Sequence, residues 1–187
     1  MDARRVGALC RATQPLYIVV ELLVAAAAVT SYDLVSSTIS ELGVAALSPG
    51  HVVMNGAFVL FGVTLVLGAV LGDPPSPTAR VLWVVAGLSS VATGLAPLDT
   101  APVAHLVVSA PVFLAQPVAL LLTGTALRSR IAIALGAVSI VASAVFLLGL
   151  APDLGGLLER LALWPGYLVL GVLGLRTLAR ASATSAG

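Results

Sequence analysis

Charged residues are scarce in this sequence of 187 residues: they make up 9% of the chain, against about 25% of an ordinary soluble domain. Hydrophobic residues make up 59%, and the mean hydropathy is +1.12. A soluble fold of this size would lack the polar side chains that its surface needs, and a disordered chain would leave too much apolar surface in water. The composition therefore predicts an integral membrane protein.

Lysine is absent and cysteine occurs once. All nine basic residues are arginine, and the formal net charge is only +1, so the chain has no electrostatic footprint for nucleic acid. The one cysteine, Cys10, lies among the arginines near the N-terminus and cannot form a disulfide within the chain. These absences exclude a nucleic-acid-binding protein and an internal disulfide.

Long apolar runs occupy most of the sequence. A helix needs about 20 apolar residues to cross about 30 Å of hydrocarbon, and six stretches qualify. Their lengths, and the lack of an alternating pattern, favour helices over barrel strands. The sequence thus predicts an all-α membrane protein, a six-transmembrane-helix bundle forming a single domain (1–187), with spans at 14–32, 51–72, 81–98, 103–126, 131–150 and 158–176.

The arginines predict the orientation of the bundle. In a six-span chain Arg160 falls on one side of the membrane and the other eight arginines fall on the opposite side. The positive-inside rule assigns the arginine-rich side to the cytoplasm, so both termini are predicted to be cytoplasmic, in the inner (plasma) membrane. Trp83 and Trp164 are interpreted as belt residues at opposite interfaces. The acids predicted to lie outside are Asp33, Glu41, Asp99, Asp153 and Glu159.

Two similar segments, Gly94-Leu-Ala-Pro-Leu-Asp99 and Gly149-Leu-Ala-Pro-Asp153, close the third and fifth spans, and Tyr32-Asp33 ends the first. Each outward helix therefore stops at an acid, which suggests three helical hairpins in a pseudo-repeat. Coincidence is the alternative, because proline and aspartate end helices in many contexts.

Glu21 is the only acid placed deep in a span. Because it interrupts the apolar run, we interpret the first span as a retained anchor and not a signal peptide. An ionised carboxylate at this depth costs several kcal/mol unless it is paired. Glu21 is about 10–14 Å, and Gln116 about 15 Å, from the inner ends of their helices, so Gln116 is a predicted partner. Such a pair is either a structural hydrogen bond between helices or part of a proton or headgroup site.

The segment 33–43 is the most polar stretch of the chain. Thr38-Ile-Ser-Glu41 fits a capping box and predicts a short interfacial helix over 38–47, and Ser48-Pro49 is predicted to cap the second span. Capping leaves some hydroxyls without a role, near the predicted outer mouth of the bundle: Ser36, Ser37 and Ser40.

His51 and His105 begin the second and fourth spans, on the same predicted side as the outward acids. Histidines with carboxylates can hold a divalent metal that activates water. However, the sequence has no H-x-x-x-H pair, and no G-x-S-x-G elbow supports a serine hydrolase. Histidines that cap helices or reach toward the interface are the alternative. We predict no metal and no cofactor, and we expect Arg160 to pair with Glu41 or Asp99.

Four motifs occur in a characteristic order: Ser37-Thr-Ile-Ser-Glu-Leu-Gly43, the segment 94–99, His105, and Gly156-Leu-Leu-Glu-Arg160. Together they resemble the bacterial membrane proteins grouped as domain of unknown function 998, over about residues 14–176. Ala96 stands where the resemblance leads us to expect an aromatic residue. The resemblance implies a six-helix bundle with the shared polar residues outside, and it implies no reaction. Membrane ceramidase-like hydrolases are less similar, because they use three metal histidines and this chain has two.

The predicted function is that of a multi-pass membrane protein with an outward-facing polar pocket between helices, which binds or processes a lipid or isoprenoid-type ligand. The alternatives are an acid-initiated prenyl cyclase, a metal-dependent lipid hydrolase and a small transporter subunit, so enzymatic activity is left open. The predicted partner is a membrane lipid or a lipid-like small molecule. A homo-oligomer is a further alternative, since small residues permit close helix contacts within or between chains, namely Gly62, Gly68, Gly72, Gly166, Gly171 and Gly174.

The predicted site gathers polar residues from the outer ends of several helices. We expect the pocket itself to be lined by Ser40, Glu41, Asp99, His105 and Glu159. The candidate catalytic residues are Asp99, Glu41, His105 and Glu159. The candidate ligand-binding residues are Ser40, Asp33, His51, Arg160, Glu21 and Gln116.

Overall fold

The computed structural model describes residues 2–28, 32–72, 74 and 76–184, and within them every regular element is helical. Six helical segments are long and apolar enough to cross a membrane, which confirms the all-α class and the number of spans. Residues 29–31 and Asp73, which belong to the predicted first span and first short loop, lie outside the described residues. The elements are α1 (Ala3–Ala12), α2 (Leu16–Ala26), the 3₁₀ helix η1 (Ser40–Gly43), α3 (His51–Leu71), α4 (Pro77–Leu95), α5 (Pro102–Ala126), α6 (Arg130–Leu147), the 3₁₀ helix η2 (Pro152–Leu154) and α7 (Gly155–Thr184).

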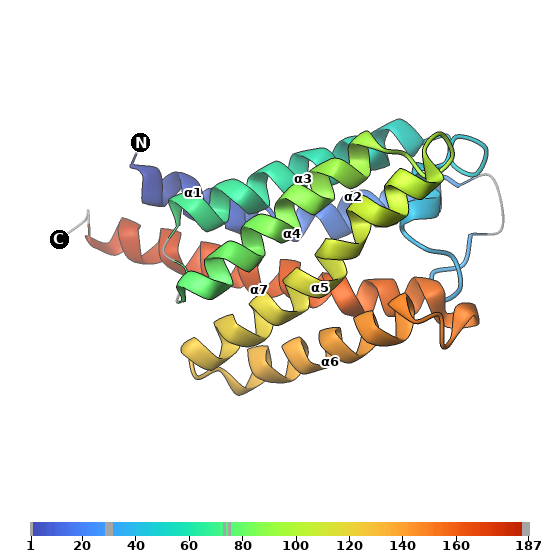
Figure 1. Cartoon of the computed structure of the whole chain (residues 1–187). Helices are drawn as coiled ribbons and strands as arrows, with labels where there is room; N and C mark the ends of the chain where they lie inside the picture. The colour runs from blue at the N-terminus through green and yellow to red at the C-terminus, as the bar shows by residue number, and fades with distance from the viewer. Residues whose placement is uncertain (1, 29–31, 73, 75, 185–187) are drawn as a thin grey trace.

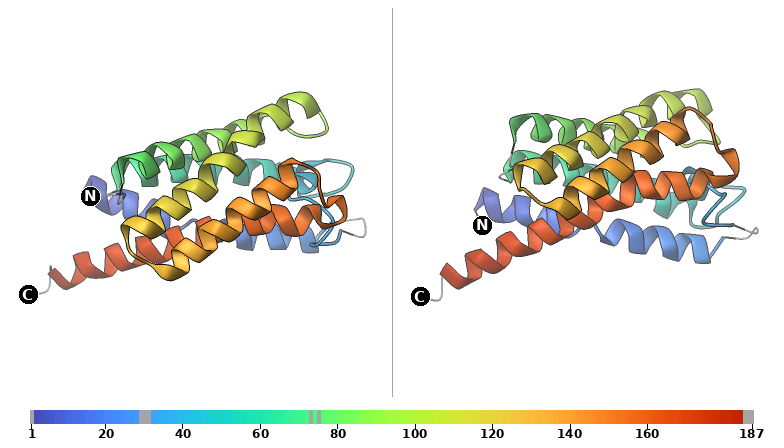
Figure 2. Two further views of the ribbon diagram at one scale, coloured as in Figure 1. Left: turned by 60° about the horizontal axis from the view of Figure 1, so that its bottom comes forward. Right: turned by 90° about the horizontal axis from the view of Figure 1, so that it is seen from below.

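The spans form a ring in which each helix packs beside the next one in sequence, and α7 closes the ring by returning beside α1 (Figures 1 and 2). Both termini lie at one end of the bundle (Figure 1), which also carries the arginines other than Arg160 and is called the arginine end below. The opposite end carries the segments 32–50, 96–101 and 148–154 and is called the loop end. The assignment of the arginine end to the cytoplasm stays a prediction.

The first span is longer than the predicted 14–32, its helix ends earlier, at Ala26, and it is broken in the middle. It begins at Ala3, and Thr13-Gln14-Pro15 separates α1 from α2. Pro15 has no N–H to continue the helical hydrogen bonds, and the side chains beside it stabilise the break. Thr13 Oγ1 donates to the Cys10 carbonyl at 3.0 Å, and buried Gln14 Nε2 donates to Thr64 Oγ1 on α3 at 2.9 Å.

Glycines allow close contacts between neighbouring helices. A Cβ atom on Gly62 would lie 2.7 Å from the Gly87 carbonyl oxygen, and a Cβ on Gly87 would lie 2.7 Å from the Gly62 carbonyl oxygen. The backbones of α3 and α4 therefore touch at this point. Gly171 of α7 faces the Pro15 ring in the same way. These small residues thus serve contacts within the chain, and the homo-oligomer remains a prediction.

Two serines on neighbouring helices form hydrogen bonds with backbone groups that prolines inside α5 and α7 leave without a helical partner. Pro111 interrupts the hydrogen bonds of α5, and Ser89 on α4 bridges the gap: its Oγ donates to the Val108 carbonyl at 2.5 Å and accepts from the Val112 N–H at 3.0 Å. Pro165 leaves the carbonyl four residues earlier without its helical donor, and Ser139 on α6 donates to that Leu161 carbonyl at 3.0 Å.

The two similar Gly-Leu-Ala-Pro segments occupy different positions relative to their helices. Gly94 lies in the last turn of α4, whereas Gly149 follows the end of α6 with a φ of 63°. Ala96 and Ala151, which precede the prolines, have similar backbone conformations, with φ of −121° and −144° and ψ of 74° and 72°. The local likeness is therefore confined to the Ala-Pro step, and an origin of the three hairpins by repetition stays a prediction.

Candidate functional site

Acidic side chains fasten the long segment 32–50 to the loop end of the bundle. Glu159 Oε2 on α7 accepts from the Ile39 N–H at 2.6 Å, and Asp99 Oδ2 accepts from the Ala45 N–H at 3.0 Å. Glu41 Oε2 accepts from the Thr38 N–H at 2.9 Å, and Thr38 Oγ1 accepts from the Glu41 N–H at 3.3 Å. This reciprocal pair confirms the capping box.

The helix that follows the capping box is much shorter than predicted. The structure has only the 3₁₀ helix η1 where a helix over 38–47 was expected. The prediction that Ser48-Pro49 caps the second span is also wrong, because Gly50 occupies the N-cap of α3. Ser48 lies two residues before Gly50 and stabilises the turn that precedes the helix, because its Oγ accepts from the Gly50 N–H at 3.1 Å. His51 Nδ1 lies 3.0 Å from the Ser48 carbonyl oxygen, so His51 holds this turn.

Arg160 on α7 is buried at the centre of the loop end. Its Nη1 donates to the carbonyls of Leu34 and Ser37 at 2.7 and 3.1 Å, and its Nη2 donates to Tyr32 Oη at 2.6 Å. Its Nε lies 2.9 Å from Glu21 Oε1, an ion-pair distance without hydrogen-bond alignment. The prediction that Arg160 pairs with Glu41 or Asp99 is therefore wrong. Its acid comes from α2, so one guanidinium ties α2, α7 and the loop together.

Glu21 faces the interior of the bundle, as predicted, but its predicted partner is wrong. The side chain is 0% exposed, and Trp164 Nε1 donates to Glu21 Oε2 at 2.8 Å. Gln116 donates instead to the Leu163 carbonyl at 2.7 Å. Trp164 is thus a partner of the ion pair, and Trp83, 2% exposed, donates to Thr123 Oγ1 at 3.2 Å. Neither tryptophan is a simple belt residue.

Tyr32 and Asp33 lie outside the helical spans, at the start of the loop. Burial raises the pKa of Tyr32 to about 12, although the adjacent Arg160 guanidinium opposes this shift. The backbone N–H groups of Ser36 and Val35 lower the pKa of exposed Asp33, whose Oδ1 accepts from them at 3.0 and 2.7 Å. Asp33 therefore stabilises a turn of the loop.

His105 links α5 to the loop through a hydrogen bond with Ser40. Its Nδ1 lies 2.8 Å from the Ala96 carbonyl oxygen, and its Nε2 lies 3.0 Å from Ser40 Oγ. A carbonyl oxygen only accepts, so Nδ1 carries the proton. In the neutral ring Nε2 is then an acceptor, and the Ser40 hydroxyl donates to it. The arrangement is a serine–histidine pair whose ring is oriented by a backbone carbonyl.

A small cavity of about 20 Å³ lies between the helices beneath η1. We call it the Tyr17 cavity. Six hydroxyl-bearing side chains and one carboxyl contribute to its wall, together with Phe58, Val112, Phe113 and Leu163; the polar residues are Tyr17, Ser40, Ser90, Thr93, Ser109, Tyr167 and Glu159. Ser40 and Glu159 are the predicted site residues that line it. His105 reaches it through Ser40, whereas Asp99 and Glu41 are engaged with the loop backbone and are not part of the wall.

The Tyr17 hydroxyl has no hydrogen-bond partner within the described chain, although the side chain is 0% exposed. Its ring is held by aromatic neighbours, with centroids 4.8 Å from Tyr167 and 5.7 Å from Phe61. A buried hydroxyl without a partner costs about 1–3 kcal/mol. The cavity thus contains one polar group that the protein itself does not satisfy.

Sequence reasoning missed the two tyrosines that line this cavity. Tyr17 and Tyr167 are polar aromatic residues inside apolar spans, but nothing in the spacing of the sequence shows that they face each other. The spacing of Ser90 and Thr93 is informative, since residues three apart share one face of a helix. That spacing predicts a polar stripe on α4 without indicating what faces it.

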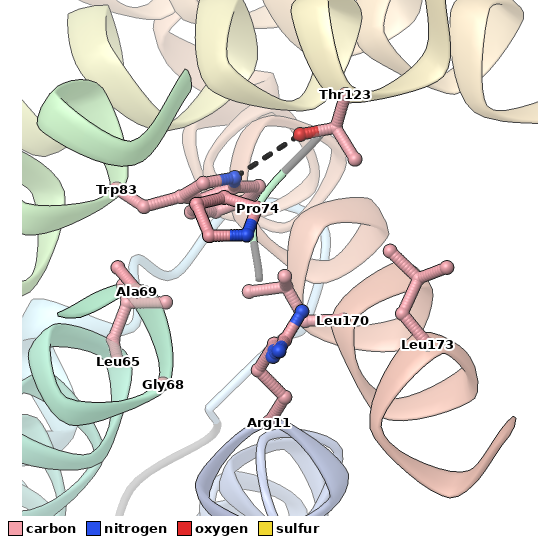
Figure 3. Close-up of a pocket in the computed structure, with 9 residues that line it drawn as sticks. All are labelled: Arg11, Leu65, Gly68, Ala69, Pro74, Trp83, Thr123, Leu170 and Leu173. Atoms are coloured by element: carbon pink, nitrogen blue, oxygen red, sulfur yellow. Dashed lines mark hydrogen bonds between the residues drawn. The ribbon is translucent and has the colours of Figure 1, made fainter. Parts of the chain in front are cut away.

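A second small cavity, of about 10 Å³, lies at the arginine end and has a different character. Its wall is formed mainly by Leu65, Ala69, Leu170 and Leu173, and Arg11 reaches into it (Figure 3). The hydrogen bond between Trp83 and Thr123 crosses its rim and satisfies both groups (Figure 3). Unlike the Tyr17 cavity, it has an apolar wall and no unsatisfied hydroxyl. The Tyr17 cavity is therefore the better candidate site.

No three His, Cys, Asp or Glu side chains among the described residues come close enough together to hold a metal ion. His51 and His105 bind different backbone carbonyls, so the two histidines are not brought to one centre.

Comparison with known proteins gives a family and nothing closer. No curated protein and no solved structure matches the chain. A family model does match, over residues 12–176, which include all six spans in whole or in part. The chain belongs to the family described as "Protein of unknown function (DUF998)".

Proposed function

We propose that this multi-pass membrane protein binds an uncharged, hydroxyl-bearing amphiphile, such as a lipid or isoprenoid alcohol, with its polar head in the Tyr17 cavity. The observation that carries the proposal is the fully buried Tyr17 hydroxyl without a partner. A ligand hydroxyl in the cavity would satisfy that group and remove its cost.

The chemistry of the wall favours an uncharged head. The Ser90, Thr93 and Ser109 hydroxyls donate to backbone carbonyls and remain acceptors for a ligand. The Tyr17 hydroxyl can also donate. No arginine is among the described residues of the wall. The aromatic and aliphatic residues beside the hydroxyls suit the first carbons of a chain. A volume of about 20 Å³ has room for about one water-sized group, which favours a single hydroxyl over a larger headgroup or a whole lipid.

The test compares wild type with Tyr17→Phe, which removes one hydroxyl and little else. Purified protein is titrated with geranylgeraniol and with a diacylglycerol, and thermal unfolding is followed in detergent. We expect at least one of these probes to stabilise wild type and to lose its effect on Tyr17→Phe. Without added probe the variant should be as stable as wild type, because an unsatisfied hydroxyl has been removed. Thr125→Val, an exposed hydroxyl on α5, is the matched control and should respond as wild type does.

Two results would contradict the proposal. One is that neither probe stabilises wild type. The other is that Tyr17→Phe responds as strongly as wild type. In either case the cavity holds only water, and its hydroxyls serve the packing of the bundle.

A second candidate function is acyl transfer, and the Ser40–His105 pair favours it. In such a reaction Ser40 Oγ would bond to the acyl carbon of an ester while its proton passed to His105 Nε2, and the departing alcohol would take that proton. Water would then release the acid and restore the serine hydroxyl. A serine-directed phosphonate should label wild type and not Ser40→Ala. Absence of labelling on wild type would dismiss this candidate and leave the binding proposal untouched.

The prenyl cyclase alternative is less favoured, because Glu159 is the only carboxylic acid among the described residues of the cavity wall. The transporter alternative stays a prediction.

A further inference from the structure

The arginine end carries a wide groove that is independent of the Tyr17 cavity. It has a volume of about 860 Å³ and is open to the surroundings. One wall is α1, the floor is α7, and the other wall is the start of α6 with the turn before it. Figure 2 shows α7 running between α1 and α6 toward the C-terminus, and α7 packs against both. We call this feature the α1–α6 groove.

Charge is concentrated at the mouth of this groove. Five arginines and one aspartate contribute to its wall: Arg4, Arg5, Arg11, Arg176, Arg180 and Asp2. Four of these arginines have exposed side chains, and Arg11 is buried. Two helices that are distant in sequence therefore present their basic residues to one shared space.

The deeper part of the groove is apolar. On α7, Leu168, Val169 and Val172 precede Arg176 and Arg180, and Leu135 of α6 faces the same space. Leu168 and Arg180 are separated by about 18 Å along the helix axis, which is comparable to half of the about 30 Å hydrocarbon thickness. The apolar residues lie within the predicted span of α7, so an occupant of this part lies in the bilayer.

We propose that the α1–α6 groove binds an anionic phospholipid of the leaflet at the arginine end, which the positive-inside rule assigns to the cytoplasm. Charge complementarity identifies the occupant. The phosphate lies among Arg5, Arg176 and Arg180, which act as hydrogen-bond donors and cations. One acyl chain lies along Leu168, Val172 and Leu135. Basic residues followed by an apolar trough, in this order along the membrane normal, match the two parts of a phospholipid in one leaflet.

The test uses purified full-length protein in a mild uncharged detergent. Phosphatidylglycerol is the anionic probe, phosphatidylcholine the zwitterionic probe, and inorganic phosphate the probe without chains. Binding is read by native mass spectrometry and by the lipid-dependent shift of the thermal midpoint. We expect wild type to retain phosphatidylglycerol in preference to phosphatidylcholine and to show no shift with inorganic phosphate.

Matched single variants separate this site from a general effect of charge. Arg176→Gln removes an arginine of the groove, and Arg80→Gln removes an arginine at the same end, on α4, which does not contribute to the wall. Each basic residue near an anionic lipid surface contributes about a factor of five in affinity. Arg176→Gln should therefore bind phosphatidylglycerol about five-fold more weakly, the triple variant Arg5→Gln/Arg176→Gln/Arg180→Gln should bind it about 100-fold more weakly, and Arg80→Gln should bind as wild type does.

A single variant tests the chain site while leaving every arginine in place. Val172→Trp narrows the apolar trough on the exposed face of α7, and we expect it to lose phosphatidylglycerol retention as well. The proposal is overturned if phosphatidylcholine binds equally well, if inorganic phosphate alone gives the shift, or if Arg176→Gln and Arg80→Gln weaken binding to the same extent. Retention of the lipid by Val172→Trp would equally overturn the acyl-chain part of the assignment.

Discussion

The two ends of the bundle use their charged residues in opposite ways. At the loop end, Arg160 and Glu159 are 4% and 2% exposed and are bonded to the protein's own backbone. At the arginine end, Arg5, Arg176 and Arg180 are exposed around an open groove. A buried charge is tolerated only when nearly all of its hydrogen bonds are made internally, whereas an exposed one remains available to the surroundings. The buried charges thus stabilise the fold, whereas the exposed arginines line the groove in which we propose that a phospholipid binds.

The most decisive test of this comparison asks on which side of the membrane each end lies. In a Cys10→Ala background, cysteine at Ser36 or Ala101 should react with an impermeant thiol reagent in intact cells. Cysteine at Thr78 or Arg128, at the arginine end, should react only after permeabilisation. Thr78 and Arg128 are suitable because their side chains are exposed and do not cap a helix, whereas Ser76 and Ser129 each cap one. The reverse labelling pattern would refute the predicted topology.

The largest difference in stability should come from removing one arginine at each end. Arg160→Leu leaves Glu21 buried without its cation and leaves several loop carbonyls without a donor. Loss of one partner from a buried pair costs about 3–5 kcal/mol. Arg80→Leu removes an exposed charge from α4 and should change stability by less than about 0.5 kcal/mol. Thermal or denaturant unfolding in detergent measures both.

A double-mutant cycle sharpens this test. Glu21→Leu should destabilise by about the same amount as Arg160→Leu, because it strands the arginine. The double variant should cost less than the two single variants together, since no unpaired buried charge remains. Additive losses would mean that Arg160 stabilises only through its bonds to the loop and Tyr32, and that the pair with Glu21 contributes nothing.

The outcome for individual residues shows what one sequence can predict. The six spans follow from apolar runs, and the capping box of Thr38 and Glu41 follows from a spacing of three residues, because both depend on nearby positions. The partner of Glu21 was mispredicted because the first span begins at Ala3 and not at residue 14. Glu21 therefore lies about 27 Å from the inner end of its helix and not about 10–14 Å, which places it near the loop end beside Arg160 and Trp164 of α7. The Tyr17 cavity could not be predicted either, since it depends on which faces of α2, α3, α4, α5 and α7 meet.

A smaller effect separates two residues that the sequence placed in one site. Asp99→Ala removes an exposed bond to the Ala45 N–H and should cost about 1 kcal/mol, while leaving binding in the Tyr17 cavity unchanged. His105→Ala leaves Ser40 without its acceptor and should weaken the stabilisation that the alcohol probes of the Tyr17 cavity give to wild type. Parallel titrations of the two variants make the comparison. Equal loss of the probe effect in both variants would mean that Asp99 also belongs to the binding site.

The smallest expected effect concerns Asp33, whose charge lies at the surface of the loop end. Because Ser36 and Val35 donate to its carboxylate in the folded protein, the pKa of Asp33 is lower in the folded chain than in the unfolded chain. The unfolded chain therefore binds a proton more readily, and the contribution of Asp33 to stability is present above its usual pKa near 4 and is lost as the pH falls through the lowered pKa. Asp33→Asn keeps the accepting oxygen of the turn and removes the titration. The thermal midpoint of wild type should thus fall slightly more steeply than that of Asp33→Asn between about pH 5 and pH 3. Identical slopes would mean that the turn is equally well formed around a protonated Asp33, so that even the exposed acid of the loop end contributes through its hydrogen bonds and not through its charge.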